Sequence, residues 1–410
     1  MTRTVWQISD TIEAAVWAAA QPSLRLYCES TSALLAAVED RSRRYTSERD
    51  ALDRPSNPQA DLAARALFFT IADAAKMHHP LSELYAAGRL TLDGSGAPLR
   101  ILDVGAGCGA MSLGLLDWLA RSAQALQLAS VRGLDITLLE RDGAALGLAS
   151  AALKRAAASL GVTMTIAEVR SDVTAGTWMR GLRPFDLIIA GTVFNELPES
   201  HQLSVASAAL QLLTPSGHAV IIEPALRETS RGLHRLRDAL VGGGAARVVA
   251  PCVHNGAVCP ALAADDDWCH EELLGGLPPR AAELARLSHL RDSGLKFAYL
   301  TLVRSDTIWP RSLRSVDGQL FRIMRPPRGL KGRVETLGCG EPGWVPLRLL
   351  RRHRTEANRA VQDAHRGDIV VLHAAQKVEG KALLDVVADD RVELLAVHLP
   401  TLAMPGTEDV

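Results

Sequence analysis

The nine residues ILDVGAGCG, at positions 101–109, decide how the surrounding chain is interpreted. The apolar run LRILDV that leads into the glycines predicts a buried β-strand, and the apolar repeat MSLGLLDWLA that follows them predicts a helix. Glycines between a strand and a helix allow a sharp turn, and their lack of a side chain lets a ligand approach the backbone closely. The stretch therefore predicts a ligand-binding loop at the end of a strand.

Strand-like and helical stretches alternate from residue 99 to about 225. The strand-like runs are LRILDV, GLDITLLE, TMTIAEV, FDLIIAG and HAVIIEP. Such alternation predicts a mostly parallel sheet with crossover helices, the Rossmann-like form of the α/β class. We place this domain at residues 96–250, after a helical region at 1–95 and before a cysteine-bearing, mostly β extension at 251–410. The extension contains the strand-like runs FAYLTLV, DIVVLHAAQKV and VELLAV.

Three features favour S-adenosylmethionine (SAM) as the ligand of this loop. The glycine spacing is G-x-G-x-G, with the acid Asp103 inside the preceding strand. Glu140 ends the next strand, where a carboxylate can accept both ribose hydroxyls, and Asp172 follows the third strand, where it can accept from the adenine amino group. A glycine loop alone would not exclude a nicotinamide cofactor, but the order of all three features predicts a class I SAM-methyltransferase fold. The predicted cofactor-binding residues are Asp103, Gly105, Gly107, Gly109, Glu140 and Asp172.

The candidate catalytic residues are Asn195 and Glu196, in the sequence TVFNELP after the strand FDLIIAG. In open α/β sheets the ligand lies beyond the carboxyl ends of the strands, so this loop should border the transferred methyl group. Methyl transfer is an in-line displacement that mainly requires a positioned nucleophile, and a general base is optional. A purely structural role for Glu196 stays open. The Asn/Asp-Pro-Pro-aromatic loop of many adenine and amide-nitrogen methyltransferases is absent.

Four of the six cysteines fall in the last 160 residues, namely Cys252, Cys259, Cys269 and Cys339. Four thiolates are enough for a tetrahedral zinc site or an iron–sulfur cluster, and His254 or His270 could replace a thiolate on zinc. The spacing C-x6-C-x9-C matches neither the zinc knuckle nor the ferredoxin run. Spacing alone therefore leaves zinc, an iron–sulfur cluster and inert buried thiols open.

Several strings in the second half of the chain carry a resemblance to a known family. These are IIEPALRETSRGLHRLRDAL, APCVHNGAVCPAL, DWCH, CGEPGW and HRGDIVVL. Together they resemble the methyltransferase-like family that assembles the mitochondrial small ribosomal subunit, with its bacterial relatives, from about residue 99 to the C-terminus. The resemblance implies a SAM-binding protein that acts on the small ribosomal subunit and its RNA. It also implies that Cys252, Cys259, Cys269 and Cys339 hold a [4Fe–4S] cluster.

Positive charge is concentrated near the C-terminal end. Residues 301–366 hold 14 Lys and Arg against 6 Asp and Glu, a net charge of +8 in a chain whose total is −1. Such asymmetry is typical of a surface that meets phosphate, although a solvated face without a partner remains an alternative. We expect contacts with ribosomal RNA from the basic residues of segment 322–354. These are Arg322, Arg325, Arg328, Lys331, Arg333, Arg348, Arg351, Arg352 and Arg354.

The sequence leaves three functions to be distinguished. The first is a SAM-dependent methyltransferase acting on small-subunit ribosomal RNA. The second is a SAM-binding ribosome-assembly factor that transfers no methyl group. The third is a small-molecule or protein methyltransferase with a structural zinc site, which the basic segment and the four cysteines disfavour. We expect a cytoplasmic protein, because no apolar run approaches the ~20 residues of a membrane span and the N-terminal stretch lacks an apolar signal core.

Overall fold

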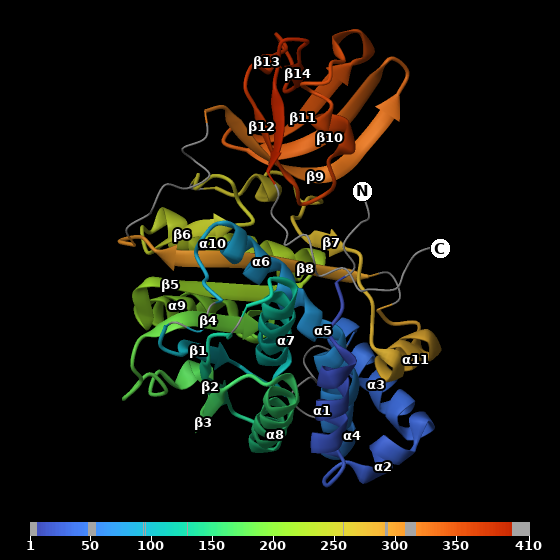
Figure 1. Ribbon diagram of the computed structural model, residues 1–410, viewed down its shortest axis with the longest axis vertical. Helices are drawn as coiled ribbons and strands as arrows, with labels where there is room; N and C mark the ends of the chain where they lie inside the picture. Colours follow the sequence, from blue (N-terminus) through green and yellow to red (C-terminus); the bar gives the residue numbers. More distant parts are fainter. Residues whose placement is uncertain are drawn as a thin grey trace.

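The computed structural model describes residues 6–47, 55–92, 94, 96–128, 130–256, 258–291, 294–307 and 317–395. A helical N-terminal region, a central α/β unit and a C-terminal β unit follow one another along the chain (Figure 1). Within these residues no helix combines the length and the apolar character that crossing a membrane requires.

The N-terminal region is mostly helical in its described part, as predicted. Its elements are α1 (Asp10–Ala20), α2 (Arg25–Glu29), α3 (Thr31–Thr46), α4 (Pro58–Ala64), the π-helix η2 (Arg65–Thr70), α5 (Ile71–Ala74), the 3₁₀-helix η3 (Ala75–Met77) and α6 (His78–Ala86). Asn57 begins the continuous run from α4 to α6, because its side chain accepts hydrogen bonds from the amides of Gln59 and Ala60.

The central unit is built on an eight-stranded sheet in the order β3-β2-β1-β4-β5-β8-β6, with β7 paired to β8. Its strands are β1 (Leu99–Val104), β2 (Leu134–Glu140), β3 (Met164–Arg170), β4 (Phe185–Gly191), β5 (Leu213–Pro224), β6 (Ala246–Ala250), β7 (Glu271–Leu273) and β8 (Leu295–Arg304). Strands β1 to β5 are parallel, and β8 runs antiparallel to both β5 and β6. The order reverses between β1 and β4, the type of point at which open α/β sheets bind ligands. The predicted α/β class and mostly parallel sheet are confirmed.

Helices cover both faces of this sheet. They are α7 (Ala110–Ala125) and α8 (Gly143–Leu160) on one face and α9 (Glu199–Gln211) and α10 (Arg227–Gly242) on the other, whereas α11 (Pro279–Ser288) packs against the N-terminal helices α1 and α3. Along β1, Leu99 and Ile101 join a core shared with α7, α8 and the N-terminal helices, whereas Leu102 and Val104 join the core beneath α9 and α10. Strands covered on both faces are apolar on both sides, which explains the unbroken apolar runs in the sequence.

One strand lies in a different sheet from the one that we expected. The run FAYLTLV was assigned to the C-terminal β extension, but it forms most of β8, in the central sheet between β5 and β6. Seven consecutive residues of β8, from Phe297 to Val303, are buried because the strand has neighbours on both edges and packing on both faces. Residues 271–304 thus contribute β7, α11 and β8 to the central unit, and its edge does not coincide with the expected boundary at residue 250.

The C-terminal unit is mostly β, as predicted. Its seven-stranded sheet has the order β13-β14-β11-β10-β9-β12-β15. The elements are β9 (Gln319–Leu330), β10 (Arg333–Gly340), β11 (Gly343–Leu350), α12 (Ala360–Asp363), β12 (Ile369–Leu372), β13 (Gln376–Lys377), β14 (Leu384–Val386) and β15 (Val392–Leu395). A separate small core that includes Phe321, Leu347 and Val370 holds it together. Figure 1 shows this unit above the edge of the central sheet where β6 and β8 lie.

Candidate cofactor cavity and cysteine cluster

A cavity of about 1180 Å³ lies at the carboxyl ends of the parallel strands, and loops after β1, β2, β3, β4 and β5 line it. The N-terminal helices α3, α4 and α5, with η2, form another part of its wall. Of the predicted cofactor-binding and catalytic residues, those in the wall are Gly105, Gly107, Glu140, Asp172, Asn195 and Glu196. The topology thus brings together residues that lie as far apart as positions 105 and 196.

The glycine loop has the conformation that requires glycine. Gly105 and Gly107 have φ angles of 64° and 53°, in the left-handed region. A Cβ on Gly105 would lie 2.5 Å from Cγ2 of Val193, so the loop after β4 closes directly over this residue. A Cβ on Gly107 would meet no atom within 4 Å, and this residue therefore has open space for a ligand beside it.

Glu140 connects the end of β2 to the glycine loop. Its Oε2 accepts a hydrogen bond from the amide of Gly107 at 2.8 Å, and its Oε1 accepts one from the amide of Asp142 at 2.9 Å. An ionised carboxylate has about four acceptor positions, so these two bonds orient the group and leave positions for further donors. This geometry suits the predicted contact with two ribose hydroxyls.

Asp103 and Gly109 lie behind the cavity wall. The Asp103 side chain is buried, and its Oδ2 accepts a hydrogen bond from Oγ of Ser112 at 2.6 Å. Burial raises the pKa of Asp103 to about 7. Gly109, with a φ of 88°, precedes α7, and a Cβ there would lie 3.1 Å from the Cβ of Ala149 in α8. Both residues thus support the loop from the core.

Asp172, the predicted acceptor for the adenine amino group, lies just after β3. Its Oδ1 accepts hydrogen bonds from the amide and the hydroxyl of Thr174, at 2.8 and 2.7 Å. These hydrogen bonds lower the pKa of Asp172, so the group is an anion near neutral pH. The acceptor that we predicted for an adenine amino group is therefore ionised and held in place.

The predicted catalytic pair lies in the short helix η5 (Phe194–Glu196), directly after β4. Both polar side-chain atoms of Asn195, Oδ1 and Nδ2, are buried, and neither has a hydrogen-bond partner among the described residues. Oε1 of Glu196 lies 3.8 Å from a guanidinium nitrogen of Arg41, which comes from helix α3. Glu196 therefore lies beside the N-terminal helix α3 in the cavity wall.

Two residues beside this pair were not identified from the sequence. Glu223, at the end of β5, is buried, and its Oε1 accepts a hydrogen bond from the amide of Phe194 at 2.9 Å. Burial raises the pKa of Glu223 to about 8. Thr192 has a φ of 61°, a strained value for a β-branched residue. Such strain and burial depend on tertiary packing, and only the polar end of the apolar run HAVIIEP could have indicated Glu223.

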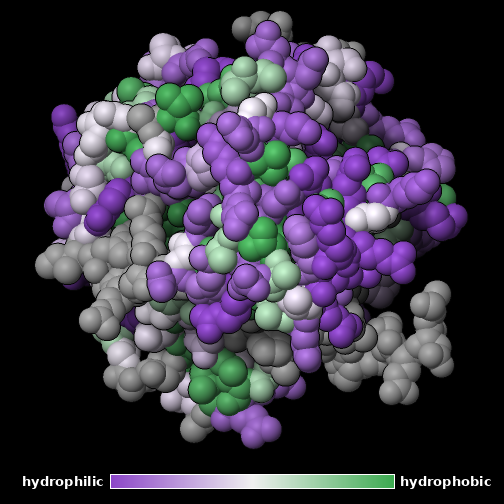
Figure 2. Space-filling view, turned by 90° about the horizontal axis from the view of Figure 1, so that it is seen from above, coloured by the Kyte–Doolittle hydropathy of each residue, from purple (hydrophilic) through white to green (hydrophobic). Residues whose placement is uncertain are grey.

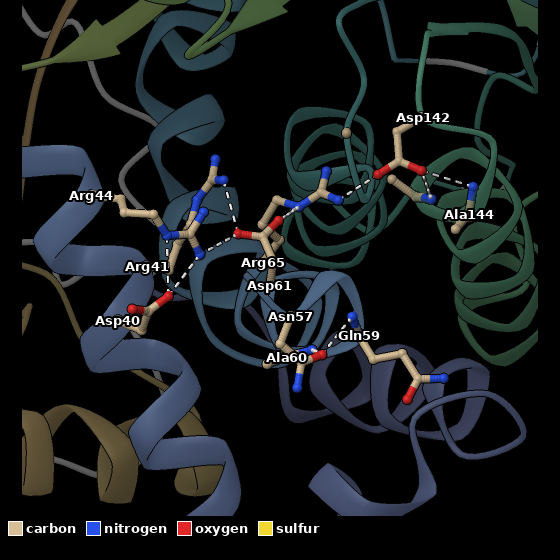
Figure 3. Close-up of polar contacts among 12 residues, drawn as sticks. Asp40, Arg41, Arg44, Asn57, Gln59, Ala60, Asp61, Arg65, Asp142 and Ala144 are labelled. Carbon is tan, nitrogen blue, oxygen red and sulfur yellow. Dashed lines mark hydrogen bonds and ion pairs between the residues drawn. The ribbon is translucent and has the colours of Figure 1, made fainter. Parts of the chain in front are cut away.

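A charged network joins the N-terminal helices to the cofactor side of the cavity (Figure 3). Asp61 receives ion pairs from Arg41 at 3.0 Å, Arg44 at 2.7 Å and Arg65 at 3.0 Å, and we call these four residues the Asp61 network. Arg65 also pairs with Asp142, whose side chain accepts from the first amides of α8. Burial would raise the pKa of Asp142, but the hydrogen bond and charge of Arg65 lower it. The sequence offered only the (i, i+4) spacing of Asp61 and Arg65 as a signal.

The four cysteines of the C-terminal half lie close together. Cys252, Cys259 and Cys269 line one small pocket beside α10 and β8, and Cys339 of β10 lies near enough to all three for their charges to interact. Burial, followed by the proximity of the other three thiols, raises the pKa of Cys269 well above its ordinary value. Nε2 of His254 lies 3.9 Å from Sγ of Cys339. Among the described residues, no three or more Cys, His, Asp or Glu side chains have an arrangement that would hold a single metal ion.

One face of α10 holds the chain segment that carries these cysteines. Arg231 donates to the carbonyl oxygens of Ala264 and Asp267, at 2.6 and 2.8 Å. His234 accepts from the amide of Cys269 at 3.0 Å, and Asp238 accepts from the amide of Cys259 at 2.9 Å. The helical spacing of positions 231, 234 and 238 places the three side chains on one face. The backbone around two of the cysteines is thus fixed from α10.

Arg322 is not a surface residue, contrary to our expectation for the basic segment. Its side chain is 3% exposed and pairs with Glu83 at 2.8 Å and Glu271 at 3.1 Å. It also donates to Oη of Tyr299 at 3.0 Å and to the carbonyl oxygen of Pro251 at 3.2 Å. We call Arg322, Glu83, Glu271 and Tyr299 the Arg322 network. A buried guanidinium with these partners attaches β9 to α6, β7 and β8, and cannot contact RNA phosphate.

The other basic residues of the segment differ in their exposure. Arg348 makes two hydrogen bonds to Asp385, at 2.6 and 2.8 Å, and Arg333 pairs with Glu335 at 2.6 Å. Those exposed at the surface are Arg325, Arg328, Lys331, Arg333, Arg351, Arg352 and Arg354. Figure 2, which looks down on the C-terminal unit, shows that much of this face is hydrophilic.

The comparison with protein families assigns the chain. The sequence profile of the family described as mitochondrial small ribosomal subunit Rsm22 matches residues 93–371. The chain belongs to the Rsm22 family. The resemblance seen in the sequence is thereby confirmed, and the matched range begins after the helices that line the cavity. No curated protein matches the chain.

Solved structures similar to this Rsm22-family chain are methyltransferases of low sequence identity. Magnesium protoporphyrin IX methyltransferase from Synechocystis PCC 6803, with bound SAM, is 13% identical and has a TM-score of 0.32, covering 65% of this chain and 96% of that one. The plantazolicin methyltransferase BamL is 10% identical with a TM-score of 0.37, covering 65% and 98%. A SAM-dependent methyltransferase from Leishmania major is 17% identical with a TM-score of 0.30, covering 53% and 73%.

Proposed function

We propose that this protein is a SAM-dependent methyltransferase that acts on the small ribosomal subunit or its RNA, during ribosome assembly. The observation that carries the proposal is the cavity at the carboxyl ends of β1 and β2, where Gly107 leaves open space and Glu140 is held by two amides. The ribosomal target follows from the name of the family to which the chain belongs.

We assign the cavity residues different roles in such a reaction. SAM supplies a methyl group on a sulfonium when it is bound. Glu140 accepts hydrogen bonds from the ribose hydroxyls, and Asp172 accepts one from the adenine amino group. Because Gly107 has no side chain, the space beside it stays open for the ligand. Asn195 orients the nucleophile, and Glu223 fixes the loop that carries it by accepting from Phe194. The chemistry then depends mainly on position, as in-line displacement requires.

We further propose that the four cysteines hold a [4Fe–4S] cluster. Thiolates are the usual ligands of such clusters, and four thiols converge here. The choice of a cluster over zinc rests on the family resemblance of the strings that carry these cysteines. Because Cys339 lies on β10 and the other three lie beside α10, the cluster would join the C-terminal and central units.

The exposed basic residues of segment 325–354 provide the proposed contact with ribosomal RNA. Arg325, Arg328 and Lys331 are exposed along β9 and the turn that follows it. Arg and Lys side chains bind phosphates without reading the base sequence, which suits a protein that docks on a folded RNA surface.

Calorimetry with SAM, followed by transfer of a labelled methyl group, tests the proposed enzyme. Small-subunit particles from a strain that lacks the protein are the acceptor. We expect the wild type to bind SAM and label the RNA, and Gly107→Asp to lose both, because a carboxylate would occupy the ligand's space. Gly147→Asp is the matched control, since this exposed position of α8 also has no atom within 4 Å of an added Cβ.

Each outcome of this test favours one function. SAM binding without transfer would favour a non-catalytic assembly factor, and labelled protein or small molecules would favour a different acceptor class. If SAM does not bind, the proposal is wrong. For the cluster, anaerobically purified protein should contain iron and sulfide in equal amounts. Replacing any of Cys252, Cys259, Cys269 or Cys339 by Ser should remove both, whereas Cys28→Ser and Cys108→Ser should not; zinc in their place would contradict the cluster.

A further inference from the structure

The cavity extends beyond the predicted cofactor contacts. Pockets for drug-sized ligands usually enclose about 300–1000 Å³, whereas this cavity measures about 1180 Å³. Glu140, Asp172 and the glycine loop account for one end of its wall, and Tyr45 and Phe69 of the N-terminal helices belong to another part. The cavity therefore has room for a second group beside the cofactor.

An irregular helix forms this part of the wall. The six residues of η2 are π-helical, between α-helical turns on both sides. π-Helical turns are rare and occur frequently at functional sites. Arg65, Phe69 and Thr70 of η2 line the cavity, whereas the neighbouring Phe68 is fully buried in the core. The distortion thus lies where the N-terminal region meets the cavity.

Two aromatic rings lie together in this wall. The ring centroids of Tyr45 and Phe69 are 5.7 Å apart, and both rings are only partly buried. The Tyr45 hydroxyl accepts a hydrogen bond from Arg41 at 2.8 Å, and Arg41 lies 3.8 Å from Glu196. The aromatic pair is therefore linked to the loop after β4, which also carries Asn195.

Asn195, next to Glu196 in the loop after β4, provides an unused hydrogen-bonding group in the wall of the same cavity. Its amide oxygen and nitrogen are both buried and lack partners among the described residues. Buried polar groups are almost always hydrogen-bonded, so an unpaired amide in a cavity wall points to a ligand that supplies the partners. An amide offers one acceptor and one donor side by side, which matches an edge such as N6 and N7 of adenine.

We infer that this end of the cavity binds a single unstacked nucleobase, which stacks on Phe69, meets the steeply inclined ring of Tyr45 at its edge and is recognised by the amide of Asn195. Enzymes that modify a base inside folded nucleic acid take it out of the stack, hold it against aromatic or apolar side chains and hydrogen-bond its edge. The inference rests on the proposed function, because it specifies the acceptor as a nucleotide. It also gives the N-terminal helices a role in forming the substrate site.

Titration of nucleoside 5′-monophosphates into protein saturated with S-adenosylhomocysteine tests the inference, because the product analogue occupies the cofactor end. AMP, GMP, CMP and UMP are each measured by calorimetry. We expect at least one to bind the wild type, and Phe69→Leu to weaken that binding roughly ten- to hundredfold, the effect of losing one base–aromatic stack. Asn195→Asp, which keeps the acceptor but loses the donor, should change the ranking of the four nucleotides.

Tyr85→Leu is the matched control, because it removes another partly buried aromatic ring of the N-terminal helices that is not in the cavity wall, whereas the ring of Phe68 packs on that of Phe69. It should leave nucleotide affinity unchanged, and all three variants should keep the affinity for S-adenosylhomocysteine. If no nucleotide binds, or if Phe69→Leu and Asn195→Asp behave as the wild type does, the inference is overturned. Equal losses in Tyr85→Leu and Phe69→Leu would also overturn it, since the effect would then be structural.

The same titration separates this inference from the proposed function. One outcome would be that SAM binds, the methyl group is transferred to protein instead of RNA, and no nucleotide binds. This outcome would support methyltransferase activity and contradict the nucleobase site. If S-adenosylhomocysteine does not bind, the proposed function fails at its first step. The nucleotides are then titrated into protein without S-adenosylhomocysteine. Nucleotide binding that depends on Phe69 and Asn195 still supports the nucleobase site, and a lack of nucleotide binding overturns it.

Discussion

Two buried charged networks attach the flanking regions to the central sheet, and they have opposite arrangements. In the Asp61 network one carboxylate is surrounded by three guanidinium groups. In the Arg322 network one guanidinium is surrounded by two carboxylates, a phenol and a backbone carbonyl. The first joins α3, α4 and η2 to one another and, through the pair of Arg65 with Asp142, to the start of α8. The second joins the C-terminal unit to α6, β7 and β8.

The two networks differ in their access to a ligand. Asp61, Arg41 and Arg65 belong to the wall of the large cavity. Arg322 is buried, and burial would lower its pKa, but Glu83 and its other partners raise the pKa well above the ordinary value. A charge sealed between units can only hold them in one arrangement, whereas charges beside a cavity can exchange partners with water or with a ligand. The comparison suggests a fixed C-terminal junction and a ligand-sensitive N-terminal one.

The largest effect is expected at the sealed network. Arg322→Ala leaves Glu83 and Glu271 buried without their cation, and breaking such a pair costs about 3–5 kcal/mol. We expect a loss of this size in the free energy of unfolding, measured by urea denaturation. Arg325→Ala, on the same strand but exposed, should change it by less than about 0.5 kcal/mol. A loss below about 1 kcal/mol in Arg322→Ala would show that the junction does not depend on this charge.

A smaller effect is expected at the cavity network. Asp61→Asn removes the negative charge shared by Arg41, Arg44 and Arg65, but water in the cavity can solvate part of the positive charge that remains. We expect a loss of about 1–3 kcal/mol, the usual cost of a buried group left unsatisfied. Asp61→Asn should also weaken SAM binding in calorimetry, because Arg65 would hold Asp142 less firmly. A loss equal to that of Arg322→Ala, with unchanged SAM affinity, would contradict the difference between the networks.

A pH titration provides a third test on the cavity side. The pKa of Glu223 rises from 4.5 to about 8 in the folded protein, because burial favours the neutral form. Its contribution to stability is therefore complete below pH 4.5 and is lost as the pH rises through 8. Glu223→Gln mimics the neutral form, so from pH 7 to pH 8.5 its free energy of unfolding should rise by about 1.3 kcal/mol relative to the wild type, since one pKa unit corresponds to about 1.4 kcal/mol. A constant difference across this range would contradict the raised pKa.

The exposed basic residues should have the smallest effect on folding. Reversing the charges of Arg325, Arg328 and Lys331 together should change the free energy of unfolding by less than about 0.5 kcal/mol for each site. RNA binding should weaken, and the dependence of log affinity on log salt should become shallower by roughly 0.7 to 0.9 per lost phosphate contact. SAM binding should survive. An unchanged salt slope would show that this face does not meet phosphate.

The sequence predicts local features well and tertiary placement poorly. The bounds of β4 agree with the run FDLIIAG, because an apolar strand between turns is a local pattern. By contrast, FAYLTLV was placed in the wrong sheet, since its pattern shows burial on both faces but does not identify the neighbouring strands. The basic stretch around β9 to β11 was not recognised as a hairpin series, because Arg at every third position (322, 325 and 328) does not follow the alternation typical of a strand.

The same distinction applies to the candidate site. The glycine loop, Glu140 and Asp172 could be found because each follows a strand at a fixed place in the sequence. Arg65 and Phe69 could not, because their place in the cavity depends on how α4 and η2 dock against a sheet that begins at residue 99. Arg322 was counted with the surface basic residues, because the residues next to it in the sequence do not indicate that Glu83 and Glu271 converge on it.

The antiparallel strand β8 has a consequence for the order in which the chain acquires its structure during synthesis. Its partners along β5 lie about eighty positions earlier, for example Ile222 opposite Tyr299. Until residue 304 has left the ribosomal tunnel, β5 lacks its neighbour on that side, and its unpaired backbone edge can recruit other chains. Pairings over such sequence separations form slowly. The nascent protein therefore passes through a stage at which an apolar edge is exposed, and only the late arrival of β8 closes it.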